Sequence, residues 1–290
     1  MKPKLLKPVL KDYIWGGTRL KEEYGFTTDK PTVAEAWMLS CHKDGKNIDE
    51  DVPILIKLID ARDKLSVQVH PDDEYAYRIE GEPGKTEMWY IIDHEPGAQL
   101  IYGFKKTLSK REFKKRIQNN TLDEVVNYVP VHKGDVFFIP SGTLHAIGSG
   151  ILIAEIQQNS NTTYRVSDYG RLGADGKPRT LHIDKAIDVT KLEPPTTPYG
   201  AIGKVTAYPF GTVRRLADCK YFTVDSISLN GVYKPKSSAF GHILVLEGEI
   251  TVGDIHATKG ESVYIPAESS VEISGKAQLI YSTKNDNENY

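Results

Sequence analysis

Only two cysteines occur among the 290 residues, and Cys41 and Cys219 lie far apart with no cysteine-rich spacing around either. This excludes a disulfide framework and a thiolate zinc finger. A chain of this length buries enough surface to fold without such cross-links. We therefore expect the cysteines to be small buried apolar residues, and any bound metal to serve function rather than stability.

The sequence also lacks an excess of either charge and any long apolar run. Lys and Arg number 37 and Asp and Glu number 39, so the formal net charge is −2. Such a balance argues against a surface devoted to nucleic acid or anionic lipid. No apolar run approaches the length that spans a bilayer, and residues 1–8 lack the apolar core of a signal peptide. We expect a cytoplasmic protein without membrane or nucleic-acid partners.

What the sequence does contain is a series of short apolar or alternating segments bounded by Gly, Pro, Asn and Asp. Many short strands punctuated by turn residues are typical of a β-sandwich or barrel. We therefore predict a mainly β fold. The predicted strands are Pro53–Ile59, Leu65–Val69, Met88–Ile92, Val136–Ile139, Ile151–Ile156, Phe222–Leu229, His242–Leu246 and Ser262–Ile265.

Helix-start signals are concentrated within about residues 107–128. Ser109–Glu112 and Thr121–Glu124 each have the spacing of a capping box, and each predicts the start of a helix. A third short helix is expected at residues 183–189. The basic residues around the first helix are interpreted as a solvated helix face, because no aromatic residues are interleaved with them.

A proline-rich run, Lys-Leu-Glu-Pro-Pro-Thr-Thr-Pro-Tyr-Gly, occupies residues 191–200 and has no periodicity. Such a run is typical of an interdomain linker. We therefore predict a first domain at residues 1–190, with the helical segment inside it, and a second domain at residues 201–290.

An internal repeat relates the two predicted domains. Residues 133–140, Lys-Gly-Asp-Val-Phe-Phe-Ile-Pro, are echoed by residues 259–266, Lys-Gly-Glu-Ser-Val-Tyr-Ile-Pro. The repeat indicates related halves, and its turn, acidic residue, strand and proline resemble a motif of cupins, which are small jelly rolls. Five residues after the proline stand His145 in the first copy and Val271 in the second. If His145 binds a metal, only the first half is metallated.

Candidate ligands for such a metal lie on other predicted strands. Gln68 and His70 are two residues apart before Pro71, so both side chains point to one face of a strand that the proline ends. A polar pair inside a barrel has to be satisfied, and a metal satisfies both groups. A solvent-facing pair or a hydrogen-bonded core histidine is the alternative. Glu87 begins another apolar segment, and Lys85 precedes it on the same face.

His145 follows a turn that returns the chain into the barrel. Together with the other three candidates it offers two imidazole nitrogens, one carboxylate and one amide oxygen. That donor set suits Zn²⁺, and by ligand type it also accommodates Fe²⁺, Co²⁺ or Mn²⁺.

Three motifs in this order resemble those of type I mannose-6-phosphate isomerases in their short bacterial form. They are Gln-Val-His-Pro-Asp-Asp at 68–73, Gly-Lys-Thr-Glu-Met-Trp-Tyr at 84–90 and Ile-Pro-Ser-Gly-Thr-Leu-His-Ala at 139–146. The resemblance implies two cupin-type jelly-roll barrels, with a small helical insertion in the first and a metal-free second barrel. It also implies that one Zn²⁺ per chain is bound by Gln68, His70, Glu87 and His145.

The resemblance further implies a reaction and a small-molecule partner. The reaction is the reversible isomerisation of mannose 6-phosphate and fructose 6-phosphate, in a monomer or homodimer. An aldose–ketose isomerase moves a proton between adjacent carbons through an enediol, so it needs an electrophile for the oxygen and a base. The metal serves as the electrophile. The resemblance points to Lys57, Lys85 and Arg165 as cations near the phosphate and the developing oxyanion.

The proton-transfer base stays open between Glu155, Lys85 and a metal-bound water. Glu155 lies in an otherwise apolar strand, and a buried carboxylate there has a raised pKa unless it is paired. The alternative is a charge on the outer face of the strand. Lys57 also interrupts an apolar strand, where it either reaches a polar cleft or extends outwards from an edge. The segment around Arg165 departs from that of longer relatives.

Two other functions stay open at this point. One is another metal-dependent cupin reaction, such as that of an Fe²⁺ dioxygenase, and the other is sugar binding without catalysis. The non-catalytic alternative predicts a missing ligand or cation, and the sequence contains all of them.

Overall fold

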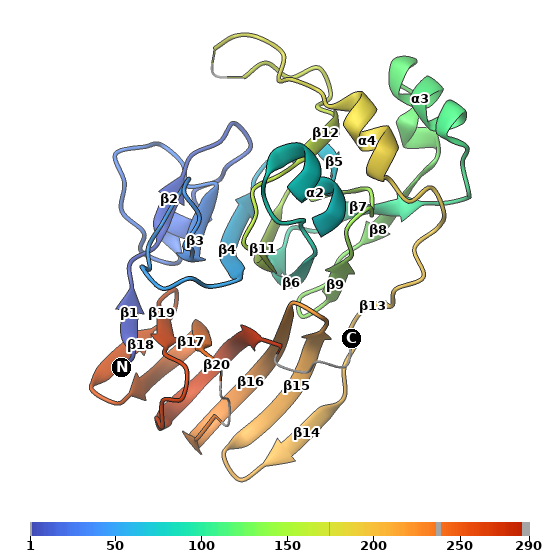
Figure 1. The fold of residues 1–290 in the computed structure, drawn as a ribbon. Helices are drawn as coiled ribbons and strands as arrows, with labels where there is room; N and C mark the ends of the chain where they lie inside the picture. The colour runs from blue at the N-terminus through green and yellow to red at the C-terminus, as the bar shows by residue number, and fades with distance from the viewer. Residues whose placement is uncertain (1, 174, 236–238, 286–290) are drawn as a thin grey trace.

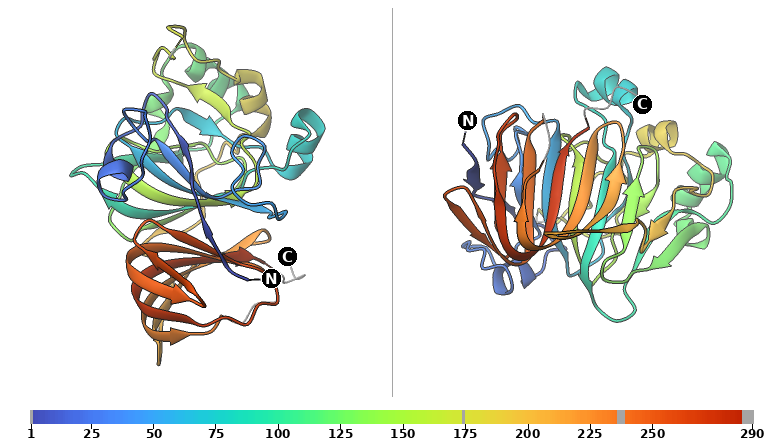
Figure 2. Two further views of the ribbon diagram at one scale, coloured as in Figure 1. Left: turned by 90° about the vertical axis from the view of Figure 1, so that its left-hand side faces the viewer. Right: turned by 90° about the horizontal axis from the view of Figure 1, so that it is seen from below.

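The computed structural model describes residues 2–173, 175–235 and 239–285, and most of its regular structure is β-strand. Figures 1 and 2 show two β-rich bodies packed against each other, with the helices at the periphery of the first body. The predicted mainly β fold is confirmed. None of the helices in the described part of the chain is long and apolar enough to cross a membrane.

The first body contains two sheets, both antiparallel. One has the order β13-β9-β6-β11-β4-β3-β2 and the other the order β12-β5-β10-β7-β8. The first of these sheets consists of β2 (Val9–Lys11), β3 (Glu35–Leu39), β4 (Ile54–Ala61), β6 (Glu87–His94), β9 (Val136–Ile139), β11 (Ile151–Gln158) and β13 (Tyr199–Gly200). The second consists of β5 (Val67–Val69), β7 (Gln99–Phe104), β8 (Val126–Pro130), β10 (His145–Ala146) and β12 (Tyr164–Ser167).

The second body is built on one sheet, with the order β1-β19-β17-β20-β16-β15-β14 and β18 paired with β17. Its strands are β1 (Lys4–Leu6), β14 (Val205–Tyr208), β15 (Gly211–Asp218), β16 (Phe222–Tyr233), β17 (Gly241–Val252), β18 (Ile255–Thr258), β19 (Ser262–Ile265) and β20 (Ile273–Lys284). All eight strands predicted from the sequence overlap observed strands.

The helices are α1 (Arg19–Glu22), α2 (Asp73–Glu80), α3 (Lys110–Gln118) and α4 (Ile183–Val189), with a 3₁₀ turn at Leu122–Glu124. The first predicted capping box is confirmed, because the Ser109 hydroxyl accepts a hydrogen bond from the Glu112 N–H at 3.1 Å. The second box is wrong, because Thr121 makes no side-chain cap and only the 3₁₀ turn follows it. The helix at residues 183–189 is confirmed by α4.

The two bodies are joined by more than one segment. β1, from the start of the chain, pairs with β19 of the second body (Figure 1), and Lys4 lies opposite Tyr264. β13 lies at the end of the predicted linker and pairs with β9 of the first body. The division at residues 191–200 stays a prediction, and β1 crosses it.

Strand β6 shows how the cores are arranged. Met88, Tyr90 and Ile92 point out of the first body and join an apolar cluster that includes strands of the second body. Trp89 and Ile91 point into the first barrel and belong to its interior cluster. This alternation follows from the two-residue repeat of a strand. Glu87 has the same parity as Trp89, so its carboxylate points into the first barrel.

A histidine is buried in the interface between the two bodies. His242 on β17 is 0% exposed, and burial lowers its pKa to about 3, against an opposing contribution from the Met38 backbone. An imidazole in the unfolded chain has a pKa of about 6.5. Below that value the unfolded state binds more protons than the folded state, so stability falls as the pH falls.

We expect the substitution His242→Gln to weaken this acid sensitivity. Between pH 7 and pH 5 the wild type should lose about 2 kcal/mol more free energy of unfolding than the variant, the cost of keeping one imidazole neutral. Urea unfolding at the two pH values measures the difference. The control is His256→Gln, which alters an exposed histidine of the same body. Equal pH dependence of the wild type and the His242 variant would contradict the assignment.

Candidate active site

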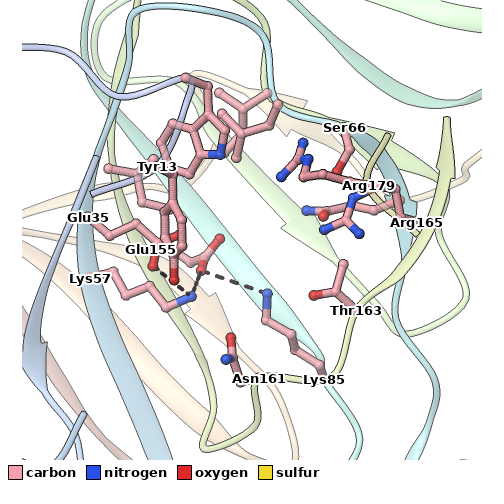
Figure 3. Close-up of a pocket in the computed structure, with 15 residues that line it drawn as sticks. Tyr13, Glu35, Lys57, Ser66, Lys85, Glu155, Asn161, Thr163, Arg165 and Arg179 are labelled. Atoms are coloured by element: carbon pink, nitrogen blue, oxygen red, sulfur yellow. Dashed lines mark ion pairs between the residues drawn. The ribbon is translucent and has the colours of Figure 1, made fainter. Parts of the chain in front are cut away.

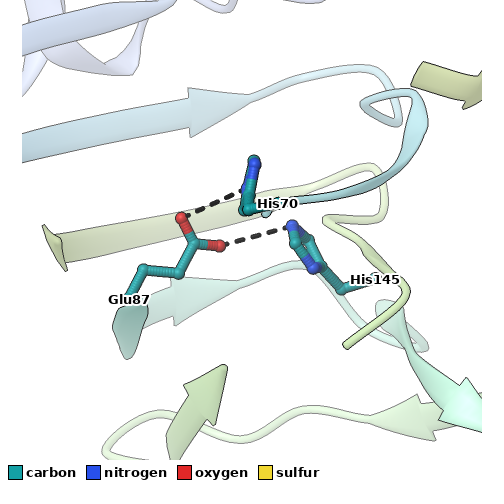
Figure 4. A group of neighbouring side chains, drawn as sticks. All are labelled: His70, Glu87 and His145. Atoms are coloured by element: carbon teal, nitrogen blue, oxygen red, sulfur yellow. Dashed lines mark ion pairs between the residues drawn. The ribbon is translucent and has the colours of Figure 1, made fainter. Parts of the chain in front are cut away.

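Three of the predicted metal ligands meet inside the first barrel. His70 directly follows β5, Glu87 is the first residue of β6, and His145 lies in the short strand β10. Their ligand atoms all lie within 4.8 Å of one another (Figure 4). The Glu87 carboxylate oxygens lie 3.6 Å from His70 Nε2 and 3.3 Å from His145 Nε2. Each side chain is at most 1% exposed.

Backbone carbonyls orient the two imidazole rings. His70 Nδ1 lies 2.9 Å from the Thr162 carbonyl oxygen, and His145 Nδ1 lies 2.8 Å from that of Thr143. A carbonyl accepts hydrogen bonds only, so Nδ1 carries the proton and Nε2 presents a lone pair towards Glu87. Burial lowers the pKa of His70 to about 3 and also lowers the pKa of His145, which keeps both rings neutral.

The chemistry of this group fits a divalent metal. Burial opposes the ionised form of Glu87, but the nearby Lys85 ammonium holds its pKa well below the usual range. His145 Nε2 and Glu87 Oε1 are buried without a hydrogen-bond partner among the described residues. Such buried polar atoms are costly unless something satisfies them. Two neutral imidazoles and one carboxylate are typical ligands of a divalent metal. A bound metal would in turn provide a partner for these buried polar atoms.

The fourth predicted ligand, Gln68, lies on β5 directly opposite His145 in the β5–β10 pairing. Its side chain is partly exposed and lines a cavity. Its role as an amide ligand stays a prediction.

This cavity has a volume of about 280 Å³ and is strongly polar (Figure 3). Lys85 joins it to the three-residue group, because its Nζ lies 2.6 Å from Glu87 Oε2 and 3.2 Å from His70 Nε2. Every other residue predicted for catalysis or substrate binding also lines the cavity, namely Lys57, Glu155 and Arg165. The polar wall is completed by four residues that were not predicted from the sequence, namely Ser66, Asn161, Thr163 and Arg179.

A buried charge network crosses the floor of the cavity. Glu155 Oε1 lies 3.0 Å from Lys57 Nζ and 3.8 Å from Lys85 Nζ, and Glu155 Oε2 accepts a hydrogen bond from Trp89 Nε1 at 2.9 Å. The register explains this, because Glu155 on β11 lies between Lys57 on β4 and Trp89 on β6. The Glu155 and Lys57 side chains both point into the barrel. The alternatives in which either of them faces outwards are therefore excluded. Burial raises the pKa of Glu155, and Glu87 raises it further.

The opposite wall of the cavity is rich in guanidinium groups. Arg165 Nη1 donates to the Thr180 carbonyl at 2.9 Å, and its Nε is buried without a partner among the described residues. Arg171 and Arg179 both bind the carboxylate of Asp168. Of the two arginines that line the cavity, Arg179 is therefore paired with a carboxylate, whereas Arg165 bonds to a backbone carbonyl. Burial lowers the pKa of Arg165 most, and the charge of Arg179 lowers it further against the opposing charge of Asp168. Such a wall is suited to an anion.

The chain is similar in sequence to known proteins. Residues 40–96 match the model of the family described as "Phosphomannose isomerase type I, catalytic domain". The chain is 40% identical to mannose-6-phosphate isomerase ManA of Bacillus subtilis, over 85% of this chain and 86% of the relative. It is 35% identical to mannose-6-phosphate isomerase of Streptococcus mutans, over 98% and 99% of the two chains.

Solved structures show the same fold. The crystal structure of the mannose 6-phosphate isomerase from Bacillus subtilis superposes with a TM-score of 0.87 at 33% identity, over 97% of this chain and 99% of that chain. A zinc-bound mannose 6-phosphate isomerase shares the fold with a TM-score of 0.77 at 16% identity, over 98% of this chain and 100% of that chain. On its sequence, its fold and the composition of its cavity, this chain belongs to the type I phosphomannose isomerase family.

Proposed function

We propose that this protein interconverts mannose 6-phosphate and fructose 6-phosphate, with one zinc ion per chain. The observation that carries the proposal is the arrangement of three groups around one cavity. A three-residue metal-ligand group adjoins it, a buried lysine–glutamate network forms its floor, and an arginine-rich wall faces that network. These correspond to the electrophile, the proton-transfer machinery and the phosphate anchor that an aldose–ketose isomerase of sugar phosphates needs.

Gln68, His70, Glu87 and His145 are the residues that would hold the zinc. When bound, the ion supplies a Lewis acid for the sugar oxygen that changes between carbonyl and hydroxyl. The imidazoles are already neutral, and the carbonyls of Thr162 and Thr143 hold their rings in place. Little reorganisation is therefore required for the ligands to bind metal.

For the proton transfer we assign the base to Glu155. It lines the cavity, its carboxylate is held by Trp89, and burial raises its pKa above that of an ordinary glutamate, which makes it a stronger base. Lys57 and Lys85 lie on either side of it. Their ammonium groups stabilise the negative charge that develops on the enediol oxygens. Lys85 remains the alternative base.

Arg165 is proposed to bind the phosphate, because its guanidinium lines the wall opposite Glu155 and its Nε has no partner within the described structure. We expect Arg165→Ala to raise KM for mannose 6-phosphate by about 10- to 100-fold, the loss of a charge-assisted hydrogen bond worth about 1.5–3 kcal/mol. Steady-state kinetics at constant ionic strength measures the change. The control is Arg111→Ala, on the exposed surface of α3. An unchanged KM would remove Arg165 from the phosphate site.

The activity itself is tested directly. Purified protein reconstituted with zinc should convert each sugar phosphate into the other, and failure to convert either would reject the proposal. Oxygen consumption by an iron-loaded sample would favour the dioxygenase alternative instead. The finer expectations of a cytoplasmic protein that is a monomer or homodimer belong to the same proposal.

A further inference from the structure

The two bodies share an order of strands that allows their residues to be matched. In the first body the order β9-β6-β11-β4-β3-β2 forms one sheet, and in the second β19-β17-β20-β16-β15-β14 forms the corresponding sheet (Figure 1). The sequence repeat aligns β9 with β19, so Ile139 corresponds to Ile265. Glu87 lies opposite Ile139, and Gly241 lies opposite Ile265. Gly241 is therefore the counterpart of the metal-ligand carboxylate.

The same registers match the floor of the first cavity with residues of the second body. Glu155 lies opposite Trp89, two residues after Glu87. In the same way, Tyr281 lies opposite Ile243, two residues after Gly241. Glu155 pairs across the next strand with Lys57, and Tyr281 pairs with Asp225. Tyr281 and Asp225 are thus the counterparts of Glu155 and Lys57.

These counterparts line a second and larger cavity, of about 800 Å³, in the second body. Its volume lies within the range of about 300–1,000 Å³ that is typical of small-molecule sites. The cavity is not suited to the metal of the first body. A Cβ at Gly241 would lie only 2.5 Å from Tyr281 Oη, so the tyrosine occupies the space of a ligand side chain. The repeat places Val271 where the first body has His145.

Aromatic rings form one wall of this second cavity. The rings of Tyr208 and Phe210 are stacked, with centroids 5.2 Å apart and planes 6° apart. Tyr233 lies 4.8 Å from Phe210, and its ring meets that of Tyr281 edge-on at 6.1 Å. Tyr208 is 48% exposed, so part of the aromatic surface is free to contact a ligand. Such a surface is apolar but carries hydroxyl groups at its edge.

An ion pair supplies the polar wall. Arg215 Nε donates to Asp225 Oδ1 at 2.6 Å and Arg215 Nη2 to Asp225 Oδ2 at 3.3 Å, while Nη1 donates to Asp218 at 2.8 Å. At the rim, Lys234 pairs with Glu272 and Lys204 also lines the opening. The charge of Arg215 is thus shared between two carboxylates, in contrast to the guanidinium excess of the first cavity. This wall offers hydrogen bonds without a strong attraction for an anion.

We propose that the second body carries a binding site for a neutral, unphosphorylated sugar of one or two rings. The C–H face of a pyranose is apolar and packs on the Tyr208–Phe210 pair, whereas its hydroxyl groups are recognised by the Asp225 carboxylate and the Arg215 guanidinium. The charge pattern separates the two cavities by ligand class, with phosphorylated sugars in the first and neutral sugars in the second. This inference does not depend on the isomerase activity.

Methyl α-mannopyranoside is the probe, because its glycosidic bond prevents ring opening and turnover. Saturation-transfer NMR and calorimetric titration of the zinc-loaded full-length protein should show saturable binding. We expect Tyr208→Ala to raise Kd by about three- to tenfold, the loss of one aromatic contact. The half-exposed position of Tyr208 makes this substitution tolerable for the fold. Tyr128→Ala, on the surface of the first body, is the matched control.

Arg165→Ala distinguishes the two cavities, because it alters the first and should leave the Kd of the glycoside unchanged. Absence of saturable binding would overturn the proposal, as would an effect of Arg165→Ala equal to that of Tyr208→Ala. A Tyr208-dependent site that prefers mannose 6-phosphate over the methyl glycoside would overturn the assignment of a neutral ligand. The Kd of the glycoside at the second cavity does not depend on whether Arg165→Ala loses isomerase activity. Failure of the proposed isomerase function can therefore be distinguished from failure of the second binding site.

Discussion

The substitution His145→Ala is expected to remove the bound zinc and to lower kcat by at least about 10³-fold. His145 Nε2 lies 3.3 Å from the Glu87 carboxylate and has no hydrogen-bond partner in the described structure, so alanine removes an available donor atom from the ligand group. Lewis-acid stabilisation by a metal is worth several kcal/mol, and each 1.36 kcal/mol corresponds to a factor of ten in rate. The measurement is metal content by mass spectrometry together with steady-state kinetics.

The control is His132→Ala, which removes an imidazole whose side chain is 74% exposed. It should retain the zinc content and the rate of the wild type. A His145→Ala protein that keeps both would show that the group formed with His70 and Glu87 is structural. Thermal unfolding of both variants separates loss of metal from loss of fold. Gln68→Ala tests the fourth ligand in the same assay, with weaker zinc binding as the expected result.

The substitution Glu155→Gln is expected to lower kcat by about 10²- to 10⁴-fold while zinc remains bound, because it removes the proposed base and no metal ligand. The amide keeps the shape of the side chain, so the contact with Trp89 can persist. The decisive measurement is exchange of the C2 proton of mannose 6-phosphate with deuterium from the solvent. We expect exchange to slow as much as turnover does.

Exchange at the wild-type rate in this variant would transfer the role to Lys85. The matched control is Glu35→Gln, a second carboxylate of the same cavity, which accepts a hydrogen bond from Trp37 Nε1 at 2.7 Å and lies 3.8 Å from Lys57. We expect less than a tenfold effect there, because Glu35 lies at the far side of Lys57 from Glu155. A larger effect of Glu35→Gln than of Glu155→Gln would exchange their assigned roles.

The metal-ligand group could be predicted from sequence mainly because three motifs resemble those of the isomerase family, and only in part from short-range rules. Gln68 and His70 are two residues apart near a strand end, so spacing alone places them on one face. Spacing does not show that Glu87 and His145 lie beside them. The inward orientation of Glu155 and Lys57 could not be predicted in this way. Whether an interrupted apolar strand is buried on one face or both depends on what packs against it, and that is a property of the whole fold.

Some features were not predicted correctly from the sequence, and each has a specific physical reason. Arg179 reaches the cavity from an irregular segment with no periodic pattern, and it is held there by Asp168, a contact that spacing does not reveal. Helix α2 was not predicted, although Asp72 is a typical N-cap residue. In the structure the Asp72 carboxylate caps this helix by accepting a hydrogen bond from the Tyr75 N–H at 2.9 Å. The second capping box had the right residues, but Thr121 did not adopt the extended backbone of an N-cap.

Strand β6 has a consequence for how this protein can change over evolutionary time. Trp89 and Ile91 face the interior of the first barrel, whereas Met88, Tyr90 and Ile92 face the neighbouring body. A substitution at an inward-facing position is therefore selected for its effect on the barrel interior. A substitution at an outward-facing position is selected for its effect on the packing of the two bodies. A single inserted or deleted residue would exchange the two sets, placing Met88 beside the histidines and Trp89 in the joint. The evolution of the first body and that of the second are therefore coupled along this strand.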